Sequence, residues 1–289
     1  MARRLEIHAW DALPGVAERG DDWALVHGDS IEALERLAPH SVDVIFADPP
    51  YHLSNGGTTC QSGRRTRVDK GVWDASRGVG EDHAFQMRWL QACRRVLKPS
   101  GTIWVSGTQH VIFSVGYAMQ ELGFHLLNTV TWYKPNAAPN LACRFFTHSA
   151  ELVLWASPMR TKPLAHRFNY KAMKASNGGR QMRDVWELRD AAEPTERTEA
   201  DAPQQDVWAI PTPGAREKVH GRHPTQKPIA LLNRIIAASA APGDLVLDPF
   251  CGSGTTGVAA LAQGCRFLGL DQDQQYIALA ARRLRAALP

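Results

Sequence analysis

The tetrapeptide Asp48-Pro49-Pro50-Tyr51 directly follows a short apolar run, Val42–Ala47, that is rich in β-branched residues. A run of this length predicts a buried strand, and two prolines that cannot donate to a sheet ladder end it at once. In α/β proteins, the residues at such strand ends lie in the crevice where ligands bind. The sequence therefore predicts an α/β protein with a functional turn at Asp48–Tyr51.

Short apolar runs alternate with segments of helical periodicity over most of the chain. The expected strands cover residues 23–26, 42–47, 101–105, 126–133, 151–156, 244–247 and 266–270. Expected helices follow several of them: Asp29 or Ser30 can cap the first, and the last begins at Asp273. This alternation predicts one Rossmann-like domain, with a mostly parallel sheet covered by helices on both faces.

Two stretches break the alternation. Residues 52–80 are rich in Gly, Ser, Thr and Arg and have almost no periodicity, which predicts a long mobile loop. Residues 157–216 form a second interruption. Within it, residues 189–205 are mainly Asp, Glu, Ala, Pro, Thr and Gln, a composition too polar to bury a core, so we expect a flexible acidic loop.

Composition limits the class of protein. The 289 residues are 44 % hydrophobic, enough for a sizeable core, and the net charge of +4 permits a polyanionic partner without requiring one. Five cysteines without a C-x-x-C pair indicate neither a disulfide framework nor a zinc site, which favours a reducing, cytoplasmic setting and no metal. No leader-like segment and no apolar run of about 18 residues is present, so we expect no membrane partner.

A glycine loop, Gly252-x-Gly254-x-x-Gly257, follows the expected strand at 244–247, and Asp271 stands at the end of the next one. This pattern is typical of nucleotide binding, although a tight strand-to-helix turn or an NAD site would also fit it. Too few residues follow Asp271 to complete a dinucleotide fold. A cofactor with one adenosine and no pyrophosphate suits the position better, and S-adenosylmethionine is the natural candidate.

Three motifs together carry a family resemblance. They are Asp48-Pro49-Pro50-Tyr51, then His223-Pro224-Thr225-Gln226-Lys227-Pro228, then Asp248-Pro249-Phe250-x-Gly252-Ser253-Gly254-Thr255. In content and order the chain resembles the β-group of DNA amino-methyltransferases, as found in type II restriction-modification systems. The resemblance implies a permuted S-adenosylmethionine-dependent fold, with a catalytic half at 1–156, a target-recognition region at 157–216 and a cofactor-binding half at 217–289.

The resemblance also implies a set of cofactor contacts. Asp271 would bind the ribose, Asp29 would lie near the adenine, and Lys227 would face the methionine carboxylate, which suits its charge. For Asp29, a helix cap is an equally good explanation, and His223 fits a structural hydrogen bond better than catalysis. The expected cofactor residues are Asp29, Ser30, Thr225, Gln226, Lys227, Asp248, Phe250, Gly252, Ser253, Gly254, Thr255 and Asp271.

The turn Asp48–Tyr51, called here the catalytic turn, suits the chemistry of methyl transfer to an amine. The exocyclic amine of a base is a poor nucleophile, and two acceptors aimed at its N–H bonds would stabilise the positive charge that develops on methyl transfer. Asp48 can supply one acceptor and the Pro49 carbonyl the other, while Pro50 stiffens the turn without adding an N–H. Tyr51 offers an aromatic face to a base that has left the duplex.

Clusters of basic residues are candidates for DNA contacts, although solvated surface charge is the usual explanation for such runs. A Gly-rich, Arg-rich loop after the catalytic turn could close over phosphates. The candidate DNA-binding residues are Arg64, Arg65, Arg67, Lys70, Lys171, Lys174, Arg180 and Arg183, and Arg216, Lys218 and Arg222 form a further cluster.

These features predict a DNA methyltransferase acting on adenine N6 of a flipped-out base in duplex DNA, because in the family an Asp at the head of the tetrapeptide goes mostly with adenine and a Ser mostly with cytosine N4. Alternatives are a cytosine-N4 enzyme, an RNA or protein-glutamine methyltransferase, an NAD-dependent oxidoreductase and an inactive DNA-binding protein. The product of the expected cofactor would be S-adenosylhomocysteine. A homodimer and a companion restriction endonuclease stay open as partners.

Overall fold

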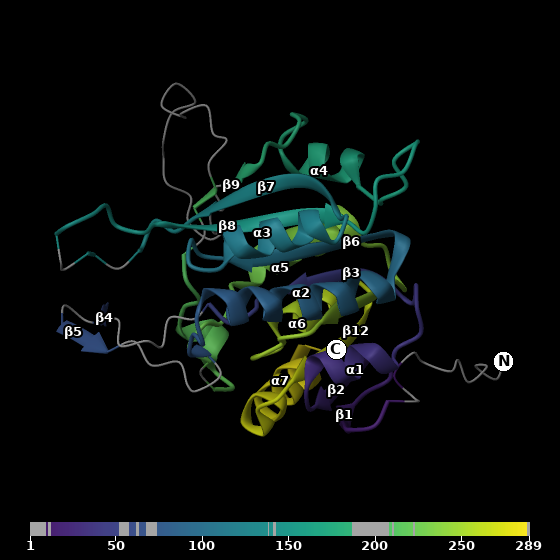
Figure 1. Ribbon diagram of the computed structural model, residues 1–289, viewed down its shortest axis with the longest axis horizontal. Helices are drawn as coiled ribbons and strands as arrows, with labels where there is room; N and C mark the ends of the chain where they lie inside the picture. The colour runs from purple at the N-terminus through teal and green to yellow at the C-terminus, as the bar shows by residue number, and fades with distance from the viewer. Residues whose placement is uncertain are drawn as a thin grey trace.

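The computed structural model describes residue 10 and residues 13–51, 58–61, 64–67, 74–137, 139–140, 143–186, 208–209, 211–221 and 223–287. A ten-stranded sheet forms its centre (Figure 1). Its strands are β1 (Val16–Arg19), β2 (Trp23–His27), β3 (Val42–Ala47), β6 (Leu97–Gly107), β7 (His125–Tyr133), β8 (Ala150–Ser157), β9 (Val185–Trp186), β10 (Trp208–Ala209), β11 (Leu245–Asp248) and β12 (Arg266–Asp271). A separate hairpin pairs β4 (Thr58–Gln61) with β5 (Arg64–Arg67).

The strands lie in the order β1-β2-β12-β11-β3-β6-β8-β7-β10, and β9 also pairs with β7. In this sheet β1 and β8 run antiparallel to their neighbours, and the remaining pairs are parallel. The prediction of a mostly parallel sheet is therefore confirmed. The carboxyl ends of the parallel strands define one edge of the sheet, called here the carboxyl edge, where ligands of α/β proteins bind.

Helices cover both faces of the sheet (Figure 1). On one face lie α1 (Ser30–Arg36), α2 (Val79–Val96) and α3 (Ile112–Glu121), and on the other α5 (Ile229–Ser239), α6 (Thr255–Leu261) and α7 (Gln274–Ala287), whose buried residues belong to two separate core clusters. The short α4 (Tyr170–Ser176) packs near α5. This arrangement is the one that the alternating sequence pattern predicts.

Strand β3 shows why the sheet is buried on both sides. Ile45 and Ala47 belong to the core cluster on the α2 face, and Val44 and Phe46 belong to the cluster on the α5 face. Because successive side chains of a strand point to opposite faces, an uninterrupted apolar run fits only a strand that is covered twice. Such a strand lies at the centre of a sheet, and β3 has β11 on one side and β6 on the other.

Two segments far apart in the sequence meet at this centre. Strand β11, from the last quarter of the chain, inserts between β12 and β3. It pairs with β3 in parallel through Val44 with Val246 and Ile45 with Leu247. The pairing brings Asp48 and Asp248, which follow or end these strands, to neighbouring positions on the carboxyl edge.

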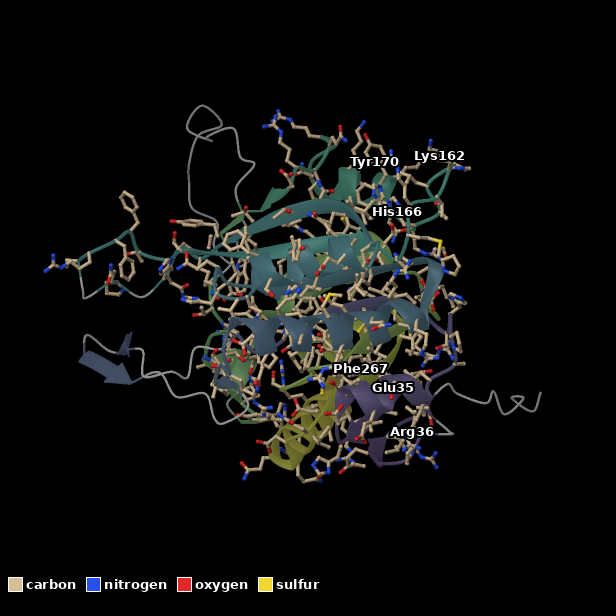
Figure 2. The ribbon with its side chains drawn as sticks, viewed as in Figure 1. Glu35, Arg36, Lys162, His166, Tyr170 and Phe267 are labelled. Carbon is tan, nitrogen blue, oxygen red and sulfur yellow. The ribbon has the colours of Figure 1, made fainter. Side chains whose placement is uncertain are left out.

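The third glycine of the glycine loop has a packing role. A Cβ on Gly257, in α6, would lie 2.4 Å from a ring carbon of Phe267 in β12. Phe267, labelled in Figure 2, is fully buried beneath α6. Only glycine therefore lets α6 lie this close to the sheet.

The prediction of an unstructured loop over residues 52–80 is wrong in part. Backbone hydrogen bonds pair Thr58–Gln61 with Arg64–Arg67 in an antiparallel hairpin, which shows no periodicity because each strand has only four residues. In addition, α2 already begins at Val79. The acidic segment 189–205 and Lys70 lie outside the described residues. Within the part of the chain that the structure describes, no helix is long and apolar enough to cross a membrane.

Candidate active site

The turn after β3 is held by one hydrogen bond within it and by another to Asp74. The Tyr51 hydroxyl donates a hydrogen bond to Asp48 Oδ1 over 2.6 Å. The Tyr51 backbone N–H donates to Asp74 Oδ1 over 2.8 Å, and Asp74 is buried. Two contacts thus fix the tetrapeptide in place, and the second ties it to the chain just before α2.

Lys227 joins the early and late motifs of the sequence. Its Nζ lies 2.5 Å from Asp48 Oδ2 and 3.8 Å from Glu151 Oε2, and it stands 5.1 Å from the centre of the Tyr51 ring. The side chain is only 7 % exposed. A lysine with so little water around it needs anionic partners, and this one has two.

Glu151 is the second carboxylate of the site. Its Oε2 accepts hydrogen bonds from the Tyr51 hydroxyl over 3.2 Å and from Ser106 Oγ over 3.3 Å. Its Oε1 pairs with Lys134 Nζ. Asp48, Tyr51, Glu151 and the two lysines thus form one buried network with two negative and two positive charges, called here the carboxylate–lysine network.

The pKa values of the two carboxylates of this network shift in opposite directions. Burial raises the pKa of Asp48, and nearby Glu151 adds to the rise against the opposing effect of Lys227. For Glu151, burial acts in the same direction, but Lys227 and Lys134 outweigh it and the pKa is lowered. Burial would lower the pKa of Lys227, yet Asp48 and Glu151 hold it above its ordinary value. The surroundings therefore favour the charged forms of Lys227 and Glu151, and they favour the neutral form of Asp48 more than water does.

The late motifs line a small pocket that opens beside Asp48. It is bounded by Phe46, Asp48, His223, Thr225, Gln226, Lys227, Asp248, Phe250, Cys251, Gly252, Ser253, Thr255 and Thr256. Most of the residues expected from the sequence to hold a cofactor thus lie around one hollow at the carboxyl edge. Its position between two adjacent parallel strands is the usual place for a ligand in this class of fold.

Asp248 fixes the glycine loop through two hydrogen bonds of its carboxylate. Its Oδ2 accepts a hydrogen bond from Thr256 Oγ1 over 2.5 Å, and its Oδ1 accepts one from the Phe250 N–H over 3.0 Å. Burial raises the pKa of this carboxyl to about 7. Asp248 therefore holds the loop in shape and can change its charge near neutral pH.

The first two glycines of the loop have backbone angles that favour glycine. Gly252 has φ +47° and a Cβ there would lie 2.9 Å from His223 Nε2, while Gly254 has φ +72° and a Cβ there would lie 2.9 Å from Ala280. His223 also accepts a hydrogen bond from the Thr225 N–H over 3.3 Å and stacks edge-on against Tyr276. These contacts agree with the structural role expected for His223.

A buried arginine on α7 supports the same loop. Arg283 Nη1 donates to Ser253 Oγ and Thr255 Oγ1, both over 2.8 Å, and to the Ser253 carbonyl over 2.7 Å. Arg283 thus holds the hydroxyl groups of Ser253 and Thr255, two residues predicted to contact a cofactor. This arginine stands late in the last helix, where the sequence pattern showed only an amphipathic segment.

Asp271, Asp29 and Ser30 lie along the same edge but do not line the pocket. Asp271 Oδ2 accepts the Gly252 N–H over 2.9 Å and Oδ1 accepts the Asp273 N–H over 2.8 Å. Asp29 caps α1 by accepting the N–H groups of Ile31 and Glu32. Since β2 and β12 are adjacent, these carboxylates extend the line of strand ends that starts at Asp48 and Asp248.

The predicted DNA-binding residues are only partly described. The backbone of β5 carries Arg64, Arg65 and Arg67 next to the catalytic turn in the sequence, and the structure describes nothing of their side chains. A second set is exposed on α4 and the segment after it, namely Lys171, Lys174, Arg180 and Arg183. Of the third cluster, Arg216 is exposed, Lys218 is half-buried and Arg222 lies outside the described residues.

Sequence reasoning missed several residues of the site: Ser106, Lys134, Glu151, Asp74 and Arg283. A signal was present for Ser106 and Glu151, because each is a polar residue within or beside an otherwise apolar strand. Lys134 directly follows β7. No local signal marks Asp74 or Arg283, because their partners lie far from them in the sequence.

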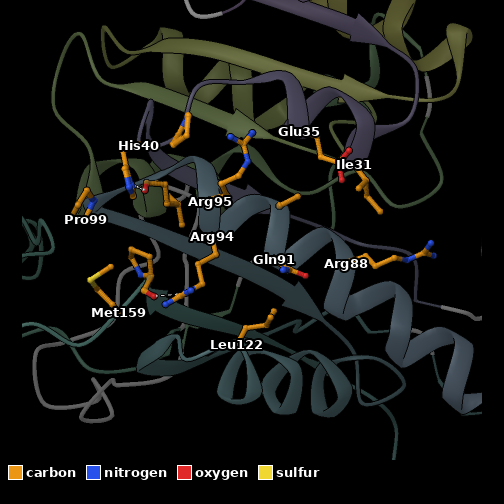
Figure 3. A pocket seen from close by; sticks show the side chains of 14 residues that line it. Ile31, Glu35, His40, Arg88, Gln91, Arg94, Arg95, Pro99, Leu122 and Met159 are labelled. Carbon is orange, nitrogen blue, oxygen red and sulfur yellow. Dashed lines mark hydrogen bonds between the residues drawn. The ribbon is translucent and has the colours of Figure 1, made fainter.

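A larger hollow, of about 560 Å³, lies at the opposite edge of the sheet between α1, α2 and the end of β8 (Figure 3). Two of its arginines are already used by the fold. Arg94 Nε donates to the Pro158 carbonyl, and Arg95 Nη2 donates to the carbonyls of Leu34 and Leu37 at the end of α1. Its size alone does not make it a reaction site, since the perturbed carboxylates lie at the carboxyl edge.

A family model described as DNA methylase, for N6 and N4 methyltransferases, matches residues 42–282. The type II methyltransferase M2.LlaDCHI of Lactococcus lactis subsp. cremoris is 48 % identical over 260 residues, which cover 90 % of this chain and 88 % of the relative. The chain also superposes on PvuII DNA methyltransferase, described as cytosine-N4-specific, with a TM-score of 0.66 at 19 % identity over 93 % of this chain and 88 % of that one. For M1.HpyAVI in complex with SAM the TM-score is 0.58 at 23 % identity, over 91 % and 98 %.

Proposed function

This chain belongs to the DNA methylase family of N6 and N4 amino-methyltransferases, and from that premise we propose that it transfers a methyl group from S-adenosylmethionine to adenine N6 in double-stranded DNA. The observation that carries the proposal is that Lys227, just before α5, meets Asp48 and Asp248, which stand at the ends of two neighbouring strands. Asp at the head of the tetrapeptide favours adenine as the base.

The residues around the pocket fit the cofactor. Gln226 lines it, and its Oε1 is buried without a hydrogen-bond partner among the described residues, so a ligand donor would satisfy it. Thr225 and Lys227 could bind the carboxylate of the cofactor. Asp271 ends the adjacent strand β12, where its carboxylate could accept hydrogen bonds from the ribose hydroxyls. When bound, S-adenosylmethionine supplies an electrophilic methyl group on its sulfonium.

Asp48 is the proposed acceptor for an N–H of the target amine. In the structure its two oxygens are taken by Tyr51 and Lys227. Lys227 already stands near Glu151, so a shift toward Glu151 or toward a cofactor carboxylate would free Asp48 Oδ2. The Pro49 carbonyl is the proposed second acceptor, and with both in place the positive charge on nitrogen is stabilised as the methyl arrives.

Tyr51 is proposed to stack on the extruded base. The residue is 7 % exposed here, with its hydroxyl inside the carboxylate–lysine network. Release of Lys227 from the neighbourhood of its ring would uncover one face. We therefore propose that the entry of the base and the movement of Lys227 are linked.

The division of labour along the chain follows the same proposal. Residues 1–156 carry the catalytic turn and residues 217–289 the cofactor loop, and 157–216 are proposed to read the target sequence. The last region supplies α4, β9 and β10, and its exposed Lys171 and Lys174 suit phosphate contacts. A homodimer and a companion endonuclease are further proposals, and sedimentation and cutting assays on methylated DNA would test them.

A labelled-methyl assay tests the proposed reaction. The protein is incubated with methyl-labelled S-adenosylmethionine and native genomic DNA that lacks methylated bases, and the nucleosides are separated after digestion. We expect the label in N6-methyladenine. Label in N4-methylcytosine would change the assigned base, and label only in added RNA or protein would refute DNA as the substrate.

A further inference from the structure

The loop that joins β7 to β8, residues 134–149, rises from the carboxyl edge. Its two ends are held together by the hydrogen bond from the Lys134 N–H to the Ser149 carbonyl over 2.7 Å, and Tyr133 pairs with Ala150 in the hairpin. Figure 1 shows the loop projecting beyond the sheet on the same side as the β4–β5 hairpin. Nothing in the proposed reaction so far uses this loop.

The base of the loop is part of the carboxylate–lysine network. Lys134, its first residue, pairs with Glu151, which follows its last by two positions and contacts the Tyr51 hydroxyl. A second tie runs from the loop to the turn after β6, through Gln109 Nε2 and His148 Nε2 at 3.4 Å. The loop is therefore rooted at the place where the target base must arrive.

The tip of the loop carries two exposed aromatic side chains. Phe145 is 59 % exposed and Phe146 is 96 % exposed. Phenylalanine side chains exposed to this degree leave much of their apolar surface in water, although Phe145 also contacts the ring of His148. Two such neighbours are a candidate interaction site. Arg144, also exposed, precedes them.

The backbone of the tip is shaped to present these rings. Asn140 Nδ2 donates to the Phe145 carbonyl over 2.6 Å, and the Cys143 N–H donates to the Asn140 carbonyl over 3.3 Å. Cys143 has φ +51°, which turns the chain sharply just before Arg144. The local hydrogen bonds thus fix the turn even though the aromatic rings have no core to pack on.

We propose that Phe145 and Phe146 form an aromatic wedge that enters the base stack of duplex DNA beside the target base. The inference rests on the proposed function, because a base that leaves the duplex leaves a gap in the stack, and apolar side chains that fill such gaps lower the cost of extrusion. Arg144 favours DNA over an apolar protein partner, since it can pair with a phosphate next to the inserted rings.

The test compares native DNA with the same DNA after heat denaturation, so that no recognition sequence need be known. The variants are Phe145→Ala/Phe146→Ala and Phe145→Leu/Phe146→Leu, and Tyr117→Ala is the control, because this aromatic residue is 58 % exposed on α3, outside the segments proposed to contact DNA. Initial methylation rates are measured on both forms of DNA.

We expect the alanine variant to lose about tenfold or more in kcat/KM on native DNA and less than about threefold on denatured DNA, because single strands have no stack to open. Leucine retains apolar bulk and should restore most of the rate on native DNA. The control should match the wild type on both substrates.

Several outcomes would overturn the wedge. Equal losses on the two substrates would assign the rings a structural role, and no loss on native DNA would remove their role altogether. A change in oligomeric state on sedimentation, with the native-to-denatured ratio unchanged, would make the patch a contact between two copies. Wild-type activity on denatured DNA alone would also refute it, whereas no wild-type activity on either DNA would refute the proposed function itself.

Discussion

At the scale of single residues, Asp48 is the proposed acceptor for the target amine and is tightly held. Both its oxygens are hydrogen-bonded inside the protein, and burial raises its pKa. A raised pKa makes the carboxylate a better acceptor for an amine N–H, since its charge is held at a cost and gains most from a new donor. The arrangement is therefore poised for a donor to displace Lys227.

Asp48→Asn should separate chemistry from cofactor binding. The amide keeps the size of the side chain but removes the charge, so we expect kcat to fall by roughly 100-fold or more. Affinity for S-adenosylmethionine should stay level or rise, because Lys227 loses its partner on Asp48 and is released toward the cofactor. Single-turnover rates measure the chemical step and calorimetry measures cofactor affinity, with Asp21→Asn, at an exposed position, as the control. An Asp48→Asn variant that binds the cofactor weakly would contradict this division of roles.

Asp248 should make stability depend on pH. Its pKa of about 7 lies above the ordinary 3.8, so the folded protein holds a proton that the unfolded chain has already lost. The stabilisation from this group is complete below about pH 4 and is lost as the pH rises through about 7. Asp248→Asn cannot titrate, so its unfolding free energy relative to the wild type should rise by about 2 kcal/mol between pH 5 and pH 7.

Urea unfolding at several pH values measures that difference, with no cofactor added. A difference between variant and wild type that stays constant with pH would show that Asp248 is ionised throughout. Groups distant from Asp248 contribute equally to both curves, so the difference reports this carboxyl together with the groups that interact with its charge, such as Asp48 and Lys227.

At the scale of elements, the hairpin of β7 and β8 links the edge of the sheet to the site. Lys134 directly follows β7 and Glu151 is the second residue of β8, and their side chains pair inside the protein. The pair is mostly shielded from water, with side-chain exposures of 18 % and 8 %. A charge left alone in such a place is costly, which couples the two residues.

A double-mutant cycle should reveal this coupling. Glu151→Gln or Lys134→Met alone should each lower the unfolding free energy by about 3 kcal/mol, whereas the double variant should lose clearly less than the sum. The exposed pair of Glu18 and Arg285 serves as control, and its cycle should give less than about 1 kcal/mol of coupling. Additive losses at Lys134 and Glu151 would mean that the two side chains act independently.

The same elements show what a sequence can predict. Apolar runs such as Val42–Ala47 reveal strands because burial on both faces leaves a continuous pattern, and the motifs at Asp48 and Asp248 predict the site because they follow such runs. The pairing of Lys134 with Glu151 depends on strand order and direction, which no local pattern encodes. Strands β9 and β10 have two residues each, too few for any periodicity.

At the scale of the whole molecule, two groups of basic residues are the candidates for contacts with DNA phosphates. One group lies on and after α4, and the arginines of the other are in β5, between the catalytic turn and α2 in the sequence. Both groups are proposed to contact phosphates. Binding would then depend steeply on salt, because each neutralised phosphate releases counterions.

The slope of DNA affinity against salt measures those contacts. Lys171→Ala/Lys174→Ala/Arg180→Ala/Arg183→Ala and Arg64→Ala/Arg65→Ala/Arg67→Ala should each lower the slope of log Kd against log salt by about 2 or more, since a phosphate contact contributes about 0.9. The control removes Arg36 and Arg88, exposed residues on α1 and α2. A slope unchanged in one variant set would assign that cluster to solvated surface, and a fall in the control would show that net charge alone sets the slope.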